Sequence, residues 1–327
     1  MARLSISESI RTALAEEMRR DPSVVLWGLD VGPYGGAFGC SKGLQKEFGP
    51  ERVLDMPIAE AGYVGAAVGA AMTGLRPVVE LQFSDWITLA SDMLVNQAAI
   101  IRYIFGTPYK VPMVLRAPCG GYISAAAQHS HMWESWFAAV PGLKVILPST
   151  AADARGLLKA AIRDDNPVLF FEHKKLYEIK SEVDLQNEET IPIGKACLCR
   201  EGRDVSVITY GYTCHLALEA ADILAKEGIE IEVLDLRTIK PIDTEAIIST
   251  AKKTGRVVAL QETWLTCSVA SEVSSLVSEF AFPYLKSPVL RVGSKDFPVP
   301  FSPVLEKEVL PKVEDIVEAI QKVMAFH

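Results

Sequence analysis

Hydrophobic positions in the first half of the chain form short apolar runs that alternate with segments of helical periodicity. The runs predict buried strands at Val24–Trp27, Val53–Ile58, Val78–Gln82, Pro112–Arg116, Lys144–Leu147 and Val168–Phe171. The periodic segments predict helices at Ile6–Met18, Tyr63–Met72, Ile87–Tyr103 and Ala151–Ile162, the last with Thr150 and Asp153 as a candidate capping box. Strands that alternate with helices are typical of an α/β fold, in which helices cover both faces of a mostly parallel sheet.

A second alternating set follows a break in this pattern. Residues 174–194 are charged and show no clear period. Beyond them, strands are predicted at Asp204–Tyr210, Glu230–Leu236, Arg256–Leu260 and Val289–Val292, and a periodic helix runs from Val313 to Met324. We therefore expect two three-layer α/β domains with parallel sheets, at residues 1–178 and 195–327, joined by a linker at residues 179–194.

Composition excludes several classes of protein. The chain has 327 residues, 49% hydrophobic and 23% charged, with 33 basic and 41 acidic residues and a net charge of −8. This apolar content excludes a disordered protein, and an acidic chain without a run of Lys and Arg is a poor binder of nucleic acid or anionic membranes. The longest uncharged apolar stretch, Ala61–Leu75, has fifteen residues, fewer than the ~20 that span a bilayer. Because the N-terminus lacks a signal-peptide core, we expect a cytoplasmic protein.

The cysteines and the common nucleotide motifs point to no site by themselves. No Cys-x-x-Cys occurs among the six cysteines. Cys197 and Cys199 would point to the same face of a strand, but four zinc ligands cannot be assembled, so we interpret the cysteines as small reduced core residues. The glycine-rich loop at residues 32–39 lacks the G-x-G-x-x-G spacing, and neither a triphosphate-binding loop nor a G-x-S-x-G elbow is present.

Glu60 lies between a predicted strand and the helix that follows it. Ligands of parallel α/β sheets bind at the carboxyl ends of the strands, where such a carboxylate could bind a ring nitrogen. The helix dipole alone also favours an acid in the first turn, and from position alone we favour that structural interpretation. Gly65 and Gly69 lie on one face of the same helix, which allows close approach of another backbone, from within the chain or from a second subunit.

Trp86 and His129 are two further candidate site residues. Trp86 follows another predicted strand and offers a flat ring for a planar cofactor, although a Trp is more often part of a core or an interface. Small residues at Ala125–Ala127 leave room around His129. A loop histidine can act as an acid, a base or a hydrogen-bond donor near neutral pH, but a lone histidine is more often structural.

Together these stretches resemble a known family over nearly the whole chain. The matching stretches keep the order and spacing of the family, and they are Asp55–Glu60, Glu80–Trp86, Gln128–Ser130, Pro141–Val145, Ala161–Pro167 and Leu234–Thr238. The family is the beta subunit of the thiamine-diphosphate-dependent component of pyruvate, branched-chain 2-oxo acid and acetoin dehydrogenase complexes. The resemblance implies a transketolase-like pyrimidine-binding domain followed by a transketolase-type C-terminal domain.

The resemblance also implies roles for individual residues. Glu60 would hydrogen-bond the aminopyrimidine ring of thiamine diphosphate and so favour removal of the thiazolium proton. Ile58 and Gln82 would line the cofactor, and Trp86 would pack against the aminopyrimidine. His129 would stabilise intermediates and assist acyl transfer to a lipoyl group. A structural potassium ion is implied as well, held mostly by the backbone carbonyl oxygens of Met113, Ala161, Ile162, Asp164 and Asn166.

A missing motif implies a partner. The magnesium and diphosphate site of this superfamily resembles Gly-Asp-Gly, and the chain contains no such sequence. The resemblance therefore implies that an alpha subunit supplies the Mg²⁺ ligands in an alpha2beta2 heterotetramer, which docks on a lipoyl-bearing acyltransferase core. The enzyme, an oxidoreductase active only when the alpha subunit is present, would cleave the carbon–carbon bond next to a carbonyl and transfer the acyl group.

Departures from the family leave the substrate and two other functions open. The sequence departs at Leu29, at His131 and at Cys267-Ser268, and His131 lies close to His129, so pyruvate, acetoin and branched-chain 2-oxo acids all stay open as substrates. The chain could instead be the C-terminal half of a split transketolase or deoxyxylulose-phosphate synthase, which would act on sugar phosphates. It could also be a non-catalytic α/β subunit that binds only a nucleotide or a partner.

Overall fold

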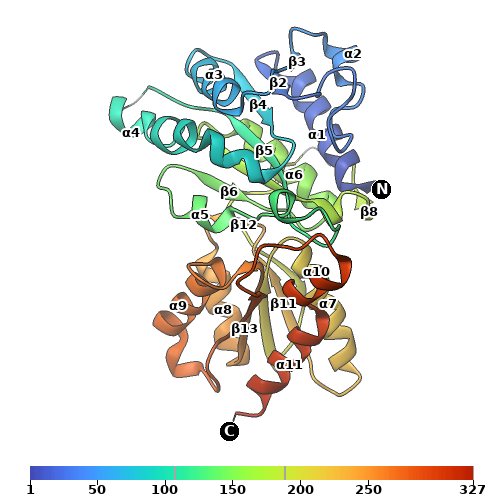
Figure 1. The fold of residues 1–327 in the computed structure, drawn as a ribbon. Coiled ribbons are helices and arrows are strands. Elements are labelled where there is room, and N and C mark those ends of the chain that lie inside the picture. The colour runs from blue at the N-terminus through green and yellow to red at the C-terminus, as the bar shows by residue number, and fades with distance from the viewer. Residues whose placement is uncertain (107, 188, 327) are drawn as a thin grey trace. The chain divides into compact units, whose positions relative to one another are not determined.

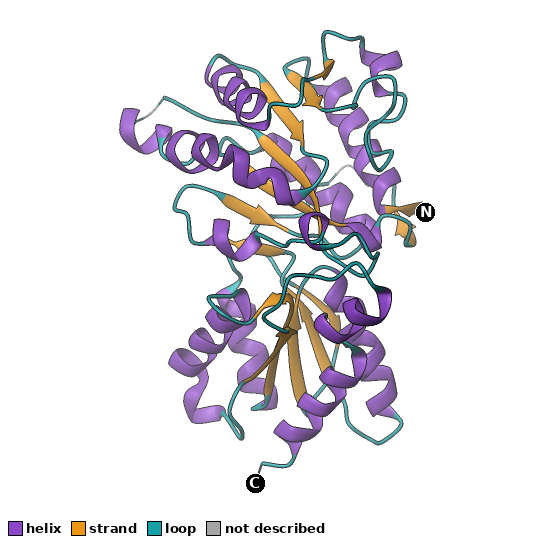
Figure 2. Ribbon diagram, viewed as in Figure 1, coloured by secondary structure: helices purple, strands orange, loops and turns teal. Residues whose placement is uncertain are grey.

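A computed structural model describes residues 1–106, 108–187 and 189–326 and divides them into two compact units. Unit 1 consists of residues 1–119 and 136–193, and unit 2 of residues 120–135 and 194 onwards. In each unit, helices pack on a central sheet, as the ribbons in Figures 1 and 2 show. The segment 120–135 clusters with unit 2 although it interrupts unit 1 in the sequence. The boundaries 1–178, 179–194 and 195–327 stay a prediction.

The sheet of unit 1 contains six parallel strands. They are β2 (Val24–Gly28), β3 (Val53–Asp55), β4 (Arg76–Glu80), β5 (Val114–Cys119), β6 (Lys144–Ile146) and β7 (Val168–His173), in the order β6-β7-β5-β4-β2-β3. Every residue of β5 and β7 is buried, which explains why these strands are mostly apolar in the sequence, apart from Arg116 of β5 and Glu172 and His173 of β7. Because the strands are parallel, their carboxyl ends meet at one edge of the sheet.

Helix caps in unit 1 follow the sequence signals. Helix α1 (Ile6–Arg20) begins with a capping box, in which the Glu8 backbone N–H donates to Ser5 Oγ at 3.2 Å and the Ser5 N–H donates to the Glu8 carboxylate at 2.8 Å. Helix α6 (Ala151–Arg163) is capped by Thr150, whose Oγ1 accepts from the Asp153 N–H at 3.1 Å, the first half of the predicted capping box. The Asp153 carboxylate accepts from the Thr150 hydroxyl at 2.6 Å in place of the Thr150 N–H. These two helices pack against each other (Figure 1).

The predicted single helix at Ile87–Tyr103 is wrong. That stretch is divided into a 3₁₀ helix, η1 (Ser84–Ala90), a π-helical segment, η2 (Met93–Ala98), and a short helix, α4 (Ile101–Phe105). Apolar periodicity does not distinguish one long helix from three short ones with different pitch. Helix α3 (Glu60–Met72) packs against both η1 and η2. The remaining short helices of the amino-terminal half are α2 (Leu44–Phe48), α5 (Glu134–Ala138), η3 (Ala127–His129) and η4 (Lys174–Leu176).

The region predicted as a linker contains a strand. Strand β8 (Lys180–Val183) pairs antiparallel with β1 (Ala2–Ser5), so the first residues of the chain are held by this region. Only one residue of each strand is buried, and the apolar alternation was therefore too weak to be recognised in the sequence.

The sheet of unit 2 is mixed, whereas a parallel sheet was predicted. Its strands are β9 (Cys197–Arg200), β10 (Val205–Thr209), β11 (Ile231–Asp235), β13 (Val257–Trp264) and β14 (Leu290–Ser294), in the order β14-β13-β10-β11-β9. The edge strand β9 pairs antiparallel with β11, and the other pairs are parallel. Sheets of this class commonly carry one antiparallel edge strand, which reverses direction without a crossover helix.

The helices of unit 2 pack in pairs. Helices α7 (Tyr212–Ala225) and α11 (Val313–Met324) lie together, as do α8 (Thr244–Thr254) and α9 (Val269–Ala281) (Figure 1). Apolar side chains of α7 and α11, among them Ala217, Leu224, Ile316 and Ile320, form one core with Val207 and Val233 of the sheet. The unit also contains α10 (Pro303–Val309), η5 (Phe282–Tyr284) and β12 (Thr238–Lys240). None of the helices in the described parts of the chain has the length and apolarity needed to cross a membrane.

Candidate active site

Three buried charges lie at the carboxyl edge of the unit 1 sheet. Arg116 of β5 is fully buried between Glu80 of β4 and Glu172 of β7. Its Nη1 donates to Glu80 Oε2 at 2.5 Å, and its Nε and Nη2 donate to the two oxygens of Glu172 at 2.7 and 2.8 Å. The Tyr177 hydroxyl donates to Glu172 at 2.6 Å. Each charge is therefore paired, as burial requires.

The charge balance of this network favours a proton on Glu80. Burial raises the pKa of Glu80, the Arg116 guanidinium lowers it, and the Glu172 carboxylate raises it again, so that it lies above its usual value. Two carboxylates share one guanidinium, and protonation of Glu80 relieves the excess negative charge. Sequence reasoning missed this network, although a signal was present: each of three mostly apolar strands contains a charged residue.

Glu60 is a buried carboxylate at the start of α3. Glu60 is 7% exposed, and within residues 1–106, 108–187 and 189–326 its carboxylate forms no hydrogen bond or salt bridge. Burial raises the pKa of the nearby Tyr63, and the charges of Glu60 and Glu80 raise it further. An acid that only complements the helix dipole can remain in water, whereas Glu60 is withdrawn from it.

The other predicted cofactor residues of unit 1 follow neighbouring strands. Ile58 lies after β3 and is 79% exposed. Gln82 lies after β4, and its Nε2 donates to Oδ2 of Asp30 at 3.3 Å. Asp30 itself follows β2. Trp86 lies in η1 and contacts Phe83 edge to face, with ring centroids 5.3 Å apart. Since β4, β2 and β3 are adjacent and η1 packs on α3, these residues gather at the edge where Glu60 lies.

His129 belongs to unit 2, in the 3₁₀ turn η3, and is half-buried. The segment before it is fixed by carboxylates of that unit: the Gly121 N–H donates to Glu262 at 2.6 Å, and the Ser124 N–H donates to Glu306 at 3.1 Å. The Tyr122 hydroxyl also donates to the Pro311 carbonyl at 2.8 Å. His129 is thus carried on a well-anchored loop.

His131 is part of an aromatic cluster. Its ring stacks on Trp133, with centroids 4.8 Å apart and planes at 21°, and it also lies 5.8 Å from the ring of Trp264. His131 and Trp264 also line a small cavity, together with Ser130, Met132 and Glu262. This departure from the family therefore changes the packing next to His129 and is not an isolated surface histidine.

Glu134 is a buried acid in the segment 120–135. The Tyr210 hydroxyl donates to its Oε1 at 2.8 Å, and its Oε2 has no hydrogen-bond partner among the described residues. Burial raises the pKa of Glu134 to about 7, although the Tyr210 hydrogen bond acts to lower it. This carboxyl therefore prefers to be neutral in the folded protein.

The raised pKa of Glu134 predicts a pH dependence of stability. Its folded pKa of about 7 lies above the ordinary value of 4.5, so its favourable contribution is present below pH 4.5 and is lost as the pH rises through 7. Between pH 5 and 8 the free energy of unfolding should fall by about 2–3 kcal/mol more in the wild type than in Glu134→Gln. Urea titrations of both proteins across this range measure the difference, and parallel curves would refute it.

Two of the five carbonyl groups expected to hold potassium are already in contact with a cation. The Arg76 guanidinium donates to the carbonyl oxygens of Ile162 and Asp164, both at 3.0 Å, and to the Asp165 carboxylate at 2.9 Å. The carbonyl oxygens of Ala161 and Met113 accept backbone hydrogen bonds. Each carbonyl oxygen keeps a second lone pair, so the donor chemistry suits potassium, but the ion would have to bind beside Arg76.

The two helical glycines of α3 have different surroundings. A Cβ on Gly65 would lie 2.9 Å from Met93 Sδ, so this glycine allows close packing within the chain. A Cβ on Gly69 would meet nothing within 4 Å. Ala61, Gly62 and Ala66 of the same helix are also exposed. Part of the small-residue face is thus open.

Comparisons with known proteins agree with this architecture. The transketolase pyrimidine-binding domain matches residues 2–180, and the transketolase C-terminal domain matches residues 194–316. A solved structure described as a split gene transketolase, an inactive beta4 tetramer, is 26% identical, with a TM-score of 0.81 over 99% of each chain. The fold therefore defines a transketolase-like two-domain α/β protein.

Sequence relatives define the family within that class. The beta subunit of the pyruvate dehydrogenase E1 component of Rhizobium meliloti is 44% identical over 99% of this chain and 70% of its own length. The beta subunit of 2-oxoisovalerate dehydrogenase of Bacillus subtilis is 45% identical over the full length of both. The beta subunit of acetoin:2,6-dichlorophenolindophenol oxidoreductase of Cupriavidus necator is 45% identical over 99% and 98%. The chain belongs to the family of 2-oxo acid and acetoin dehydrogenase beta subunits, which confirms the resemblance and the oxidoreductase class.

Proposed function

We propose that this beta subunit binds the aminopyrimidine of thiamine diphosphate through Glu60 in an enzyme that cleaves the bond next to the carbonyl of a 2-oxo acid or acetoin. Membership of the family implies dependence on this cofactor. The observation that carries the proposal is the buried Glu60 carboxylate, which forms no hydrogen bond or salt bridge with the described residues. A ring nitrogen would supply the missing partner.

Each side chain at this edge has a role in the proposal. Glu60 holds a proton at one carboxylate oxygen and shares it with the ring. The cofactor, when bound, supplies the electron sink for the carbanion. The exposed Ile58 side chain provides apolar contact, Gln82 provides an amide, and Trp86 provides a ring face against the pyrimidine.

His129 has a separate role in the proposal. It can donate a hydrogen bond to the oxygen of the substrate and transfer a proton during acyl transfer to a lipoyl group. Its support is its anchored, half-buried position after the loop held by Glu262 and Glu306. The lipoyl group would belong to the acyltransferase core of the complex, and the cytoplasmic location stays a prediction.

An alpha subunit completes the enzyme in this proposal. The relatives are known as beta subunits, and the sequence lacks Gly-Asp-Gly. We infer that an alpha chain supplies the Mg²⁺ ligands in an alpha2beta2 heterotetramer. The open face of α3 formed by Ala61, Gly62, Ala66 and Gly69 is our proposed subunit contact, because exposed small residues permit close helix approach.

Replacing Gly69 by Leu tests this contact. A Cβ at this position meets nothing within 4 Å among the described residues beyond its own helix backbone, and Leu has a higher helix propensity than Gly, so the isolated subunit should fold at least as well as the wild type. Overpacking an interface costs about 1–3 kcal/mol, so we expect roughly tenfold or greater weakening of assembly with the alpha subunit. Ser278→Leu on the exposed face of α9 is the matched control. Analytical ultracentrifugation measures assembly, and unchanged assembly of Gly69→Leu would exclude this face as a contact.

The potassium ion stays a prediction, with the carbonyl oxygens of Met113, Ala161, Ile162, Asp164 and Asn166 as its proposed ligands. We expect the melting temperature of the protein to be higher in KCl than in NaCl at equal ionic strength, because Na⁺ is too small for carbonyl groups spaced for K⁺. Equal melting temperatures in the two salts would reject the site.

Turnover by the assembled enzyme tests the proposed function. The chain is co-expressed with a candidate alpha subunit and assayed with thiamine diphosphate, Mg²⁺ and an artificial electron acceptor. Oxidation of pyruvate, acetoin or a branched-chain 2-oxo acid is the expected result, and the best substrate identifies the complex. Activity only on ketose phosphates would favour the split transketolase, which the 26% identical solved structure keeps as a second candidate. Failure of the assembled protein to bind the cofactor would favour a non-catalytic subunit.

A further inference from the structure

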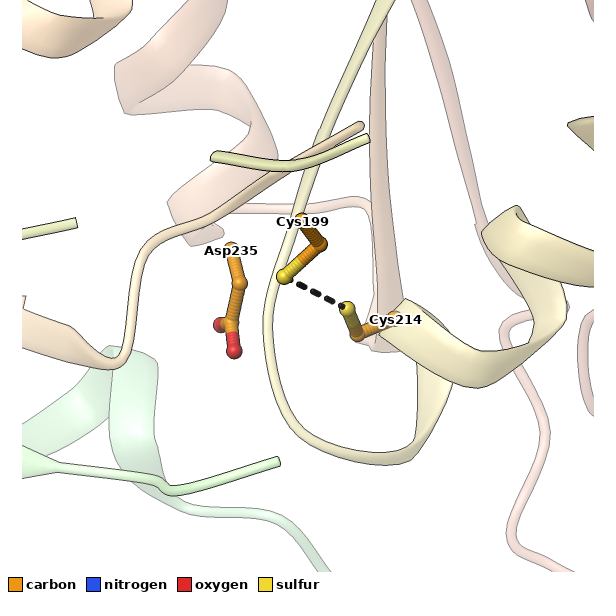
Figure 3. A group of neighbouring side chains, drawn as sticks. All are labelled: Cys199, Cys214 and Asp235. Carbon is orange, nitrogen blue, oxygen red and sulfur yellow. Dashed lines mark hydrogen bonds between the residues drawn. The ribbon is translucent and has the colours of Figure 1, made fainter. Parts of the chain in front are cut away.

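Two cysteines and one aspartate converge at the edge of the unit 2 sheet. Cys199 lies on the edge strand β9, Cys214 near the start of α7, and Asp235 at the end of β11. Their ligand atoms all lie within 4.8 Å of one another. Figure 3 shows that the two sulfur atoms face each other and that the Asp235 carboxylate lies on the other side of Cys199. These residues are far from one another in the sequence and belong to three different elements.

The spacing of the sulfur atoms fits a tetrahedral metal. The two Sγ atoms are 3.9 Å apart. With Zn–S bonds of about 2.3 Å, two thiolates at tetrahedral positions lie about 3.8 Å apart. A disulfide would require about 2.05 Å, so the two sulfurs are separate thiol groups here. Little rearrangement is needed to place one ion between them.

One of the three ligand residues is exposed to solvent, and the other two are buried. Cys214 and Asp235 are buried, whereas Cys199 is exposed on the edge strand. An ion can therefore enter from the Cys199 side. Two sulfur ligands and one oxygen ligand suit Zn²⁺, which takes thiolate and carboxylate together, better than Mg²⁺ or Ca²⁺, which require oxygen ligands.

We propose that Cys199, Cys214 and Asp235 form a binding site for one thiophilic divalent cation, Zn²⁺, with water as the fourth ligand. The site is distinct from the Mg²⁺ expected with the cofactor, and it uses neither Glu60 nor any residue of the proposed active site. Bound metal links the edge strand β9 to β11 and α7, and binding releases the thiol protons. The failure of this proposal would leave the proposed function unaffected.

Cobalt binding to the full-length chain tests the site, because Co²⁺ replaces Zn²⁺ and absorbs visibly when thiolates bind it. We expect a sulfur-to-cobalt charge-transfer band that saturates at one Co²⁺ per chain and disappears when Zn²⁺ is added. Cys199→Ser should weaken binding at least tenfold and remove the band. Its position on an exposed edge makes folding of this variant secure, and Cys214→Ala, a small apolar replacement for a buried thiol, is the second variant.

Two cysteines outside the group provide the controls. Cys267→Ser changes an exposed cysteine before α9, and Cys197→Ser changes the cysteine two residues from Cys199 on the same strand. Both should keep the band, and Zn²⁺ should raise the melting temperature of both but not of Cys199→Ser. The proposal is overturned if the wild type shows no saturable band, if Cys199→Ser keeps it, or if mass spectrometry finds a Cys199–Cys214 disulfide and no metal in the purified chain.

Discussion

Replacement of Glu60 by Gln should lower the kcat of the assembled enzyme by about 10²–10⁴-fold, the usual contribution of a positioned acid or base. The amide fills the same space as the carboxylate, so the burial of the first turn of α3 is preserved. It cannot hold the proton that the carboxylate would share with the pyrimidine ring. The loss should therefore appear in proton transfer and not in the fold.

Two measurements separate these effects. The rate at which the thiazolium C2 proton of bound cofactor exchanges with deuterium reports proton removal directly, and far-UV circular dichroism reports the fold. Glu245→Gln is the matched control, because Glu245 is also an acid in the first turn of a helix, α8, but is exposed. It should leave both measurements unchanged. If Glu60→Gln exchanges the C2 proton and turns over substrate at nearly the wild-type rate, the proposed role of Glu60 is wrong.

Replacement of Arg116 by Met should destabilise the protein by about 3–5 kcal/mol, the largest loss of stability that we expect from a single change. The guanidinium is fully buried and pairs with both Glu80 and Glu172. Without it, two buried carboxylates lie together with no compensating charge. Both would become easier to protonate, so the loss should be smaller at pH 5 than at pH 8.

Urea unfolding at the two pH values measures this effect. Arg19→Met is the control, since Arg19 pairs with Glu47 at the surface with side-chain exposures of 58% and 40%. An exposed pair of this kind contributes about 0–1 kcal/mol, so the control should change stability little. Equal losses in the two variants, or a loss that does not change with pH, would show that the buried network is not the source of the stability.

The strands were predictable from the sequence because both faces of each sheet are covered. Strands such as β5 and β7 are buried throughout, so each appeared as a mostly apolar run, apart from Arg116 in β5 and Glu172 and His173 in β7. The edge elements were not predictable, since β8 buries only one of its four residues and β9 buries none, so both carry little hydrophobic signal. The placement of the segment 120–135 with unit 2 depends on contacts between distant residues, such as Gly121 with Glu262, which no local pattern contains.

The candidate site was only partly predictable. Its position alone favoured the interpretation of Glu60 as an ordinary first-turn acid, and only the resemblance to a family assigned it a cofactor. Its burial without a protein partner is a property of the three-dimensional structure. The cysteine site was missed for a related reason, because Cys199, Cys214 and Asp235 have no motif spacing and meet only through the pairing of β9 with β11.

A structure of the chain assembled with its alpha subunit, thiamine diphosphate and Mg²⁺ tests the central proposal most directly. We predict that a carboxylate oxygen of Glu60 lies about 2.6–3.2 Å from a nitrogen of the pyrimidine ring, within hydrogen-bond distance. The diphosphate and Mg²⁺ should contact the alpha subunit. A structure in which the cofactor is fully bound while the Glu60 carboxylate contacts only protein or water would contradict the account.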